Sequence, residues 1–195
     1  FALLRNHGIP VARTEVSCDP ETVVLIAARI GYPVVVKAAD LALQHKSDIG
    51  AVKLNIRSAE SARDAVSAVQ RVLPEGASQS MVVQEMVKPG LEVIVGGVRD
   101  PQFGPVVICG LGGIWVEILR DTVLRLAPIT EERALSMLQK LRAFPILAGG
   151  RGQPALDIAS IARAIVAVGQ IMLAHPNIRS LDINPFVVYP DGQGG

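Results

Sequence analysis

Hydrophobic residues recur along this chain with two periods, one typical of helices and one typical of strands. Apolar residues fall at helical spacing within residues 20–30, 59–73, 130–142 and 156–174. Shorter apolar or alternating runs predict strands at residues 33–39, 51–56, 80–87, 91–100, 104–112, 123–129 and 180–189. The pattern therefore predicts a globular protein that mixes helices and strands.

Local signals mark the ends of the first helices. Asp19 and Pro20 supply an N-cap and a first-turn proline, and Gly31 ends the helix that they begin. Ser58 caps the next helix. The strand "PVVVKAA" between the two helices is continuously apolar, so we expect it to be covered on both faces.

The order of the elements predicts two lobes. The first part reads as α/β, and the second part, with its run of strands followed by helices, reads as α+β. We place the division between residues 1–80 and residues 81–195, with the segment "PEGASQ" (74–79) as the hinge between the lobes.

Composition narrows the class of protein. Half of the residues are hydrophobic and 19% are charged, which is typical of a folded domain. A net charge of +1 and few aromatic residues argue against nucleic-acid binding and against an anionic membrane surface. No uncharged apolar run is long enough to span a bilayer. Cys18 and Cys109 form no CxxC pattern, so we expect two ordinary thiols in the cytoplasm. The chain starts without Met and stops at "PDGQGG", so we expect both ends to be cuts within a longer protein.

Two basic segments are candidates for phosphate chemistry. Lys37 closes a strand and could hold its ammonium group in a cleft, but taken alone it is better explained as an ordinary exposed lysine at a strand end. His45 stands beside Lys46 in a polar loop, where a neutral imidazole nitrogen could attack phosphorus. A solvated loop histidine is the simpler interpretation of the same residues.

Polar residues on later strands supply further candidates. Gln84 and Glu85 end one strand, where backbone groups could meet an adenine ring, and Glu92 could accept ribose hydroxyl groups. Asp182 and Asn184 share one face of the last strand and would suit Mg²⁺. A polar hairpin surface accounts for the first group without a ligand, and the second pattern is short.

The stretch "GLGGIWVE" (110–117) concentrates glycines after a buried strand. Backbone amides there could face phosphate groups, and a tight turn that requires positive φ explains the same glycines without a ligand. Both interpretations stay open.

Taken together, the blocks resemble the ATP-grasp domain of the nucleotide-diphosphate-forming acyl-CoA synthetases. This family includes the ADP-forming acetyl-CoA synthetase β subunits and is related to succinyl-CoA synthetase. The resemblance runs along nearly the whole chain in order, through "GYPVVVKAAD", "HKSDIGAVKLN", "VVQEMV", "DPQFGPVVICGLGGIWVE", "GGRGQPALD" and "LDINPFVV". It implies a two-lobed ATP-grasp fold with the nucleotide cleft between the lobes.

The resemblance also implies roles in nucleotide binding. Lys37 matches a lysine that contacts nucleotide phosphates. Gln84 and Val87 lie on the strand between the lobes that holds adenine, with Glu85 between them, and Glu92 matches the acid that binds ribose. The implied cofactors are ATP or ADP with Mg²⁺.

For phosphoryl transfer, the resemblance assigns three more residues. Asn184 matches a Mg²⁺ ligand, and Asp182 takes the place of an acid near the travelling phosphohistidine. His45 matches a histidine thought to act as a second phosphoryl carrier. The family has a further Mg²⁺-binding Asp beyond the last strand, and this chain ends before it.

The expected reaction converts acyl-CoA, ADP and phosphate into an organic acid, CoA and ATP. The resemblance implies a partner, either a CoA-binding α-type subunit or a fused domain, that carries the first phosphohistidine; we expect the full protein to be an oligomer. The alternative is a regulatory ATP-grasp module, without turnover, of an acyl-CoA-dependent protein lysine acetyltransferase. An ATP-grasp carboxylate–amine ligase is disfavoured, because such enzymes need no loop of the His45 type.

Overall fold

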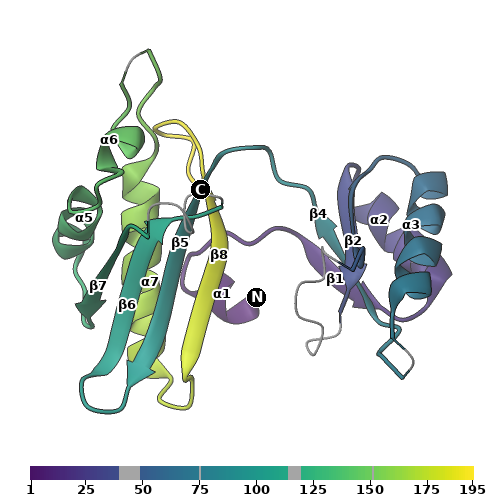
Figure 1. The fold of residues 1–195 in the computed structure, drawn as a ribbon, viewed down its shortest axis with the longest axis horizontal. Helices are drawn as coiled ribbons and strands as arrows, with labels where there is room; N and C mark the ends of the chain where they lie inside the picture. The colour runs from purple at the N-terminus through teal and green to yellow at the C-terminus, as the bar shows by residue number, and fades with distance from the viewer. Residues whose placement is uncertain (40–48, 75, 114–119, 151) are drawn as a thin grey trace. The chain divides into compact units, whose positions relative to one another are not determined.

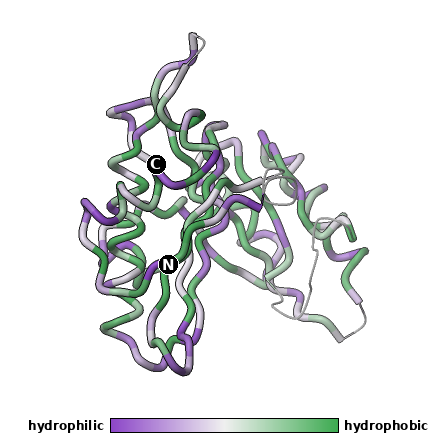
Figure 2. Tube along the Cα trace, turned by 60° about the vertical axis from the view of Figure 1, so that its left-hand side comes forward, coloured by the Kyte–Doolittle hydropathy of each residue, from purple (hydrophilic) through white to green (hydrophobic). Residues whose placement is uncertain are grey.

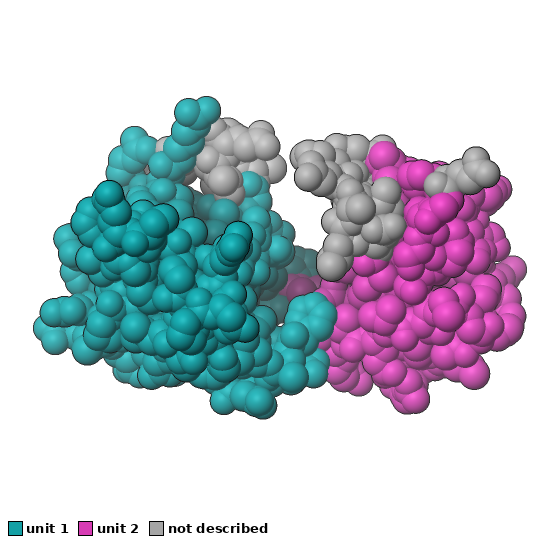
Figure 3. Space-filling model, turned by 90° about the horizontal axis from the view of Figure 1, so that it is seen from below, with its two compact units in different colours: residues 1–11, 89–195 teal, residues 12–88 magenta. Residues whose placement is uncertain are grey.

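The chain folds into two compact units. The computed structural model describes residues 1–39, 49–74, 76–113, 120–150 and 152–195. One unit comprises residues 12–88, and the other comprises residues 1–11 together with 89–195 (Figure 3). His45 and its loop lie outside the described residues.

The unit of residues 12–88 is an antiparallel sheet with helices on one face (Figure 1). Its strand order is β1-β4-β2-β3, and each described pairing is antiparallel. The elements are β1 (Thr14–Ser17), α2 (Pro20–Ile30), β2 (Val34–Ala38), β3 (Val52–Ile56), α3 (Ala59–Val72) and β4 (Met81–Glu85). Buried residues of α2 and α3 form a single core with those of β2 and β4.

The helices of this unit begin and end where the local signals predict. The Asp19 side chain accepts a hydrogen bond from the backbone N–H of Thr22, and Gly31 ends α2 with φ of 94°. Ser58 and Ser61 form a capping box at the start of α3. These predictions are confirmed.

Strand β2 differs from its prediction. Val34, Val36 and Ala38 are fully buried against the helices, whereas Val35 and Lys37 are partly exposed on the other face. The expectation that this strand is covered on both faces is therefore wrong. The exposed face of β2 carries Lys37, and its charged group would have to be buried if the strand were covered on both faces.

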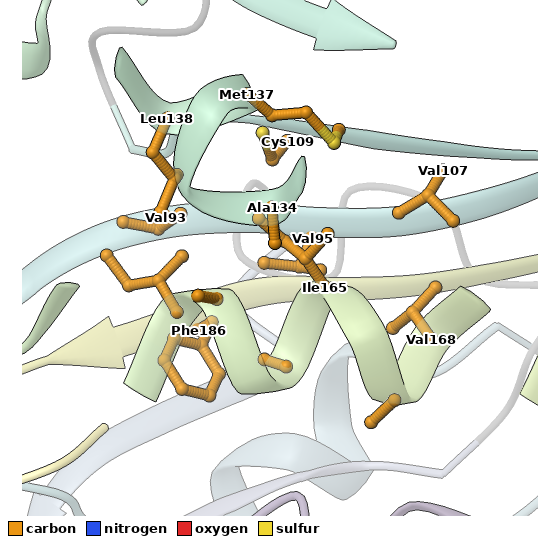
Figure 4. Packing of buried hydrophobic residues seen from close by; sticks show 14 of the residues in the cluster. Val93, Val95, Val107, Cys109, Ala134, Met137, Leu138, Ile165, Val168 and Phe186 are labelled. Atoms are coloured by element: carbon orange, nitrogen blue, oxygen red, sulfur yellow. The ribbon is translucent and has the colours of Figure 1, made fainter. Parts of the chain in front are cut away.

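The second unit is also an antiparallel sheet, with strand order β7-β6-β5-β8. Its elements are α1 (Ala2–Asn6), β5 (Leu91–Asp100), β6 (Gly104–Leu111), β7 (Thr122–Leu126), α5 (Glu131–Gln139), α6 (Phe144–Leu147), α7 (Ile158–Ala174) and β8 (Ser180–Val188). Val95 and Val107 of the sheet pack with Ile165 and Val168 of α7 (Figure 4).

Close approach of α7 to this sheet depends on a glycine. A Cβ atom at Gly97 would come within 2.6 Å of Cγ of Met172 and 3.2 Å of Cγ1 of Val168. The missing side chain therefore lets α7 lie directly on this face of β5.

The division of the chain differs from the predicted boundary at residue 80. β4 pairs with β1 and β2 and so belongs to the unit of residues 12–88. Residues 1–11 belong to the other unit, with Ile9 in its core. Because α3 and β4 lie in the same unit, the prediction of a hinge at residues 74–79 is wrong; the chain passes between the units near residues 11 and 88 instead.

Hydrophobic and hydrophilic segments alternate along the chain (Figure 2). Among the helices in the described ranges, none has the length and apolar character needed to cross a membrane.

Candidate functional site

The sheet of residues 12–88 presents polar side chains on the face opposite its helices. In the antiparallel register, Gln84 of β4 lies opposite Val35 of β2 and opposite Thr14 of β1. Lys37 stands two residues along β2, so its side chain shares this face with Gln84. All four side chains are partly exposed.

These polar groups form a chain of hydrogen bonds across three strands. Nζ of Lys37 donates to Oε1 of Gln84 at 2.9 Å. Nε2 of Gln84 then donates to Oγ1 of Thr14 at 3.1 Å, and the Thr14 hydroxyl donates to the carbonyl oxygen of Ala12 at 2.8 Å. Because an ammonium group can only donate, it fixes the direction of each bond. These hydrogen bonds therefore hold the ammonium group of Lys37 at a defined place on the partly exposed face of the sheet.

Glu85 is engaged by a residue that the sequence analysis missed. The guanidinium of Arg13 contacts both carboxylate oxygens, with Nε 3.0 Å from Oε2 and Nη2 3.2 Å from Oε1. Hydrogen bonding from Arg13 is the largest cause that lowers the pKa of Glu85 below its usual value. The signal that could have found Arg13 is the pairing of Thr14 with Gln84, which places the preceding residue beside Glu85.

The backbone groups of Val87, just after β4, are available for hydrogen bonding to a ligand. Val87 is 44% exposed, and neither its N–H nor its C=O has a hydrogen-bond partner among the described residues. The neighbouring N–H of Met86 donates to the carbonyl oxygen of Pro33 at 3.2 Å, which anchors the segment. Unpaired backbone groups on an anchored segment can recognise the donor and acceptor edge of a base.

Glu92 lies at the start of β5, in the other unit, and its position depends on two glycines. The N–H of Gly112 donates to the carbonyl oxygen of Glu92 at 2.7 Å. Gly113 has φ of +58°, and a Cβ atom there would come within 2.7 Å of Oε2 of Glu92. Positive φ at Gly113 and the close approach to Glu92 favour the tight-turn interpretation of these glycines. Residues 114–117 of the same motif lie outside the described residues.

Asp182 and Asn184 lie on β8 with exposed side chains, separated by the partly buried Ile183. Asp182 pairs with Gly96, and a Cβ atom at Gly96 would lie 3.6 Å from Oδ1 of Asp182. In the described ranges, neither side chain has a hydrogen-bond or ion-pair partner. Those ranges hold no cluster of three or more His, Cys, Asp or Glu residues that could bind a metal. The available donors are therefore one carboxylate and one amide oxygen, a set that suits Mg²⁺ when water and phosphate oxygens complete its shell.

The structure thus sorts the predicted residues into two groups. Lys37, Gln84, Glu85 and Val87 belong to the unit of residues 12–88. The other unit carries the remaining described residues, Glu92, Asp182 and Asn184. Within each group the side chains lie at accessible positions, as binding requires.

Comparison with known proteins finds matches along nearly the whole chain. The ATP-grasp domain family matches residues 1–193. The β subunit of ADP-forming acetate–CoA ligase I from Pyrococcus furiosus is 45% identical over 193 residues, which cover 97% of this chain and 83% of that protein. ADP-forming acetate–CoA ligase I from Archaeoglobus fulgidus is 39% identical, and the match covers 97% of this chain but 28% of that longer protein.

Solved structures agree with these relatives. The dinucleotide-forming acetyl-coenzyme A synthetase 1 of Ca. Korarchaeum cryptofilum, in complex with coenzyme A, Ca-AMPCP and HgCl⁺, superimposes with a TM-score of 0.92 at 38% identity, covering 98% of this chain and 85% of that one. A second structure of that enzyme, with coenzyme A and Mg-AMPPCP, gives 0.85 at 39% identity over 97% and 83% of the two chains. In that structure the phosphohistidine segment points towards the nucleotide-binding site. Our chain therefore belongs to the ATP-grasp family, as do the β subunits of the ADP-forming acetate–CoA ligases.

Proposed function

We propose that the chain is the nucleotide-binding part of an ADP-forming acyl-CoA synthetase and passes a phosphoryl group between a phosphohistidine and ADP or ATP. The observation that carries the proposal is the 45% identity to a ligase β subunit over 97% of the chain. The A. fulgidus relative is more than three times as long as the matched segment, since the match covers 28% of it. The CoA-binding part is accordingly a separate α-type subunit or a fused domain, and it carries the first phosphohistidine.

Within this function, Lys37 binds the nucleotide phosphates. Its hydrogen bond to Gln84 supports the assignment, because the bond holds the ammonium group on the partly exposed face of the sheet. The exposed backbone at Val87 binds the adenine edge, and Glu92 accepts the ribose hydroxyl groups. Glu85 contributes to the site by its position on β4 and not through its carboxylate, because Arg13 already binds that carboxylate.

Asp182 and Asn184 serve the metal and the transferred group. Their unpaired oxygen atoms fit the preference of Mg²⁺ for carboxylate and amide ligands. When bound, Mg²⁺ would offset the negative charge of the nucleotide phosphates. Asn184 is the proposed ligand, and Asp182 orients the histidine that brings the phosphoryl group.

His45 carries the phosphoryl group to the nucleotide. One imidazole nitrogen forms a P–N bond as the first phosphohistidine loses its phosphoryl group. A terminal phosphate oxygen of ADP then forms the new P–O bond, and the His45 nitrogen leaves with its electron pair. The support for this role is the resemblance of the "HKSDIGAVKLN" block to sequences of the family.

Isothermal titration of the 195-residue chain with ADP, with and without Mg²⁺, tests the nucleotide site. We expect saturable binding that Lys37→Ala weakens about tenfold, because a hydrogen bond to a charged group is lost. Asn184→Ala should remove the dependence on Mg²⁺, and the exposed Lys140→Ala is the matched control that should bind normally. Absence of binding by the wild-type chain would overturn the proposal.

A further inference from the structure

The outer edge of the second sheet carries a cavity that the nucleotide site does not use. β7 is the edge strand of this sheet and pairs with β6 alone among the described strands. A cavity of about 510 Å³ lies between β7 and α5. Its lining residues are Leu124, Arg125, Leu126, Ile129, Arg133 and Ser136. Figure 1 shows α5 beside this edge.

The free edge of β7 has open hydrogen-bonding groups. The N–H of Ala127 donates inward to the carbonyl oxygen of Pro105 on β6, at 2.9 Å. Backbone groups of successive residues in an antiparallel strand point alternately toward and away from the partner. Arg125 therefore points its backbone inward, whereas Leu124 and Leu126 turn their N–H and C=O groups outward. These are the groups that an added strand would pair with.

The two faces of this edge differ in chemistry. Leu124 pairs with Ile108 on the face opposite the helices, and Leu124 and Leu126 are 56% and 50% exposed. Arg125 pairs with Val107, whose side chain lies in the core beneath the helices, so Arg125 lies on the α5 side. There it joins the exposed Arg133 of α5 in lining the cavity. One face of the edge is thus apolar and the other is cationic.

The two arginines of the cationic side, Arg125 and Arg133, form no ion pair with the described residues. Pairing of two copies through β7 would bring these like charges together, which is destabilising. The edge therefore disfavours self-association and selects an acidic partner.

We propose that β7 is a docking edge for an extended segment of a partner polypeptide in which apolar and acidic residues alternate. Side chains of an added strand point alternately to the two faces. Its apolar residues lie beside Leu124 and Leu126, and its carboxylates pair with Arg125 and Arg133. Main-chain hydrogen bonds to Leu124 and Leu126 supply affinity, and the alternation supplies register and specificity.

A synthetic peptide tests this docking mode. The probe is a short peptide in which valine and glutamate alternate, with a fluorescein label at its N-terminus and an amidated C-terminus, and its binding to the 195-residue chain is followed by fluorescence anisotropy. Binding should slow hydrogen exchange at the amides of Leu124 and Leu126, because they become hydrogen-bonded. The same peptide N-methylated on the residues that face β7 should not bind, since it cannot form the ladder.

Charge reversal tests the acidic preference. Arg125→Glu and Arg133→Glu should each weaken peptide binding about tenfold, because an attraction becomes a repulsion. Both residues are exposed, so the variants should fold, and ADP binding should be unchanged. Arg163→Glu, an exposed position on α7, is the charge-matched control. Equal binding of the N-methylated peptide, unchanged exchange at Leu124 and Leu126, or no binding of the alternating peptide would overturn the proposal.

Discussion

Lys37 of β2 donates a hydrogen bond to Gln84 of β4 across 2.9 Å, on the sheet face that the helices leave open. The two residues are 47 positions apart in sequence, so the contact exists only because β2 and β4 pair in this register. Gln84 is itself held by the hydroxyl group of Thr14. The charge that we assign to phosphate binding is therefore positioned by the sheet.

Gln84→Leu should weaken the binding of ADP with Mg²⁺ about fivefold, because Lys37 loses a hydrogen-bonding partner that orients it. Thr14→Val removes only the far end of the chain of hydrogen bonds and should have a smaller effect. Calorimetric titration of both variants with ADP and Mg²⁺ shows which substitution weakens binding more. Unchanged affinity in Gln84→Leu would show that the contact does not position Lys37 for the nucleotide.

The Arg13–Glu85 pair should make stability depend on pH. Arg13 lowers the pKa of Glu85 from its ordinary value of 4.5 in the folded chain. The stabilisation that the Arg13–Glu85 pair gives to the folded chain is therefore fully present above pH 4.5. It is lost as the pH falls through the lower pKa that Glu85 has in the folded chain. The pair is largely exposed, so Arg13→Ala should lower the free energy of unfolding only slightly near neutral pH.

Denaturant unfolding at several pH values measures this difference. Wild type and Arg13→Ala should converge in stability at acid pH, where Glu85 is protonated in both. Arg71→Ala, on the exposed side of α3, is the control, and its unfolding free energy should change with pH in the same way as that of the wild type. A constant gap between wild type and Arg13→Ala would contradict the assignment.

Gly113→Ala should move the carboxylate of Glu92. The new Cβ atom would lie 2.7 Å from Oε2 of Glu92, so this flexible side chain must shift. Gly104→Ala places a side chain at a similarly positive φ of +80° with nothing within 4 Å. Both variants should lose about 1 kcal/mol of unfolding free energy to backbone strain. Only Gly113→Ala should also weaken ADP binding, and equal affinities would remove Glu92 from the site.

Sequence predicted those features whose causes are local. Asp19, Gly31 and Ser58 mark helix ends because their effects act within a few residues. The strand around Lys37 followed from a short continuously apolar run, and period-two spacing placed Asp182 and Asn184 on one face of the last strand.

What the sequence could not predict depends on long-range pairing. The Arg13–Glu85 contact joins residues 72 apart, and Arg13 has no local feature that distinguishes it. The boundary was misplaced at residue 80 because β4 follows α3 in sequence yet pairs with β1 and β2. The short helix α6 is only 4 residues long, too short to show helical periodicity.

Transfer through His45 is the central claim, and phosphoryl labelling of the complete enzyme tests it most directly. The chain and its CoA-binding part are supplied with acyl-CoA, ADP and radiolabelled phosphate. Wild type should show acid-labile, base-stable label on the peptide that contains His45 and should form labelled ATP. His45→Ala should keep the label on the histidine of the CoA-binding part and form no labelled ATP. His175→Ala, which changes another of the three histidines, is the matched control and should behave as wild type. Formation of labelled ATP by His45→Ala at the wild-type rate would contradict the account.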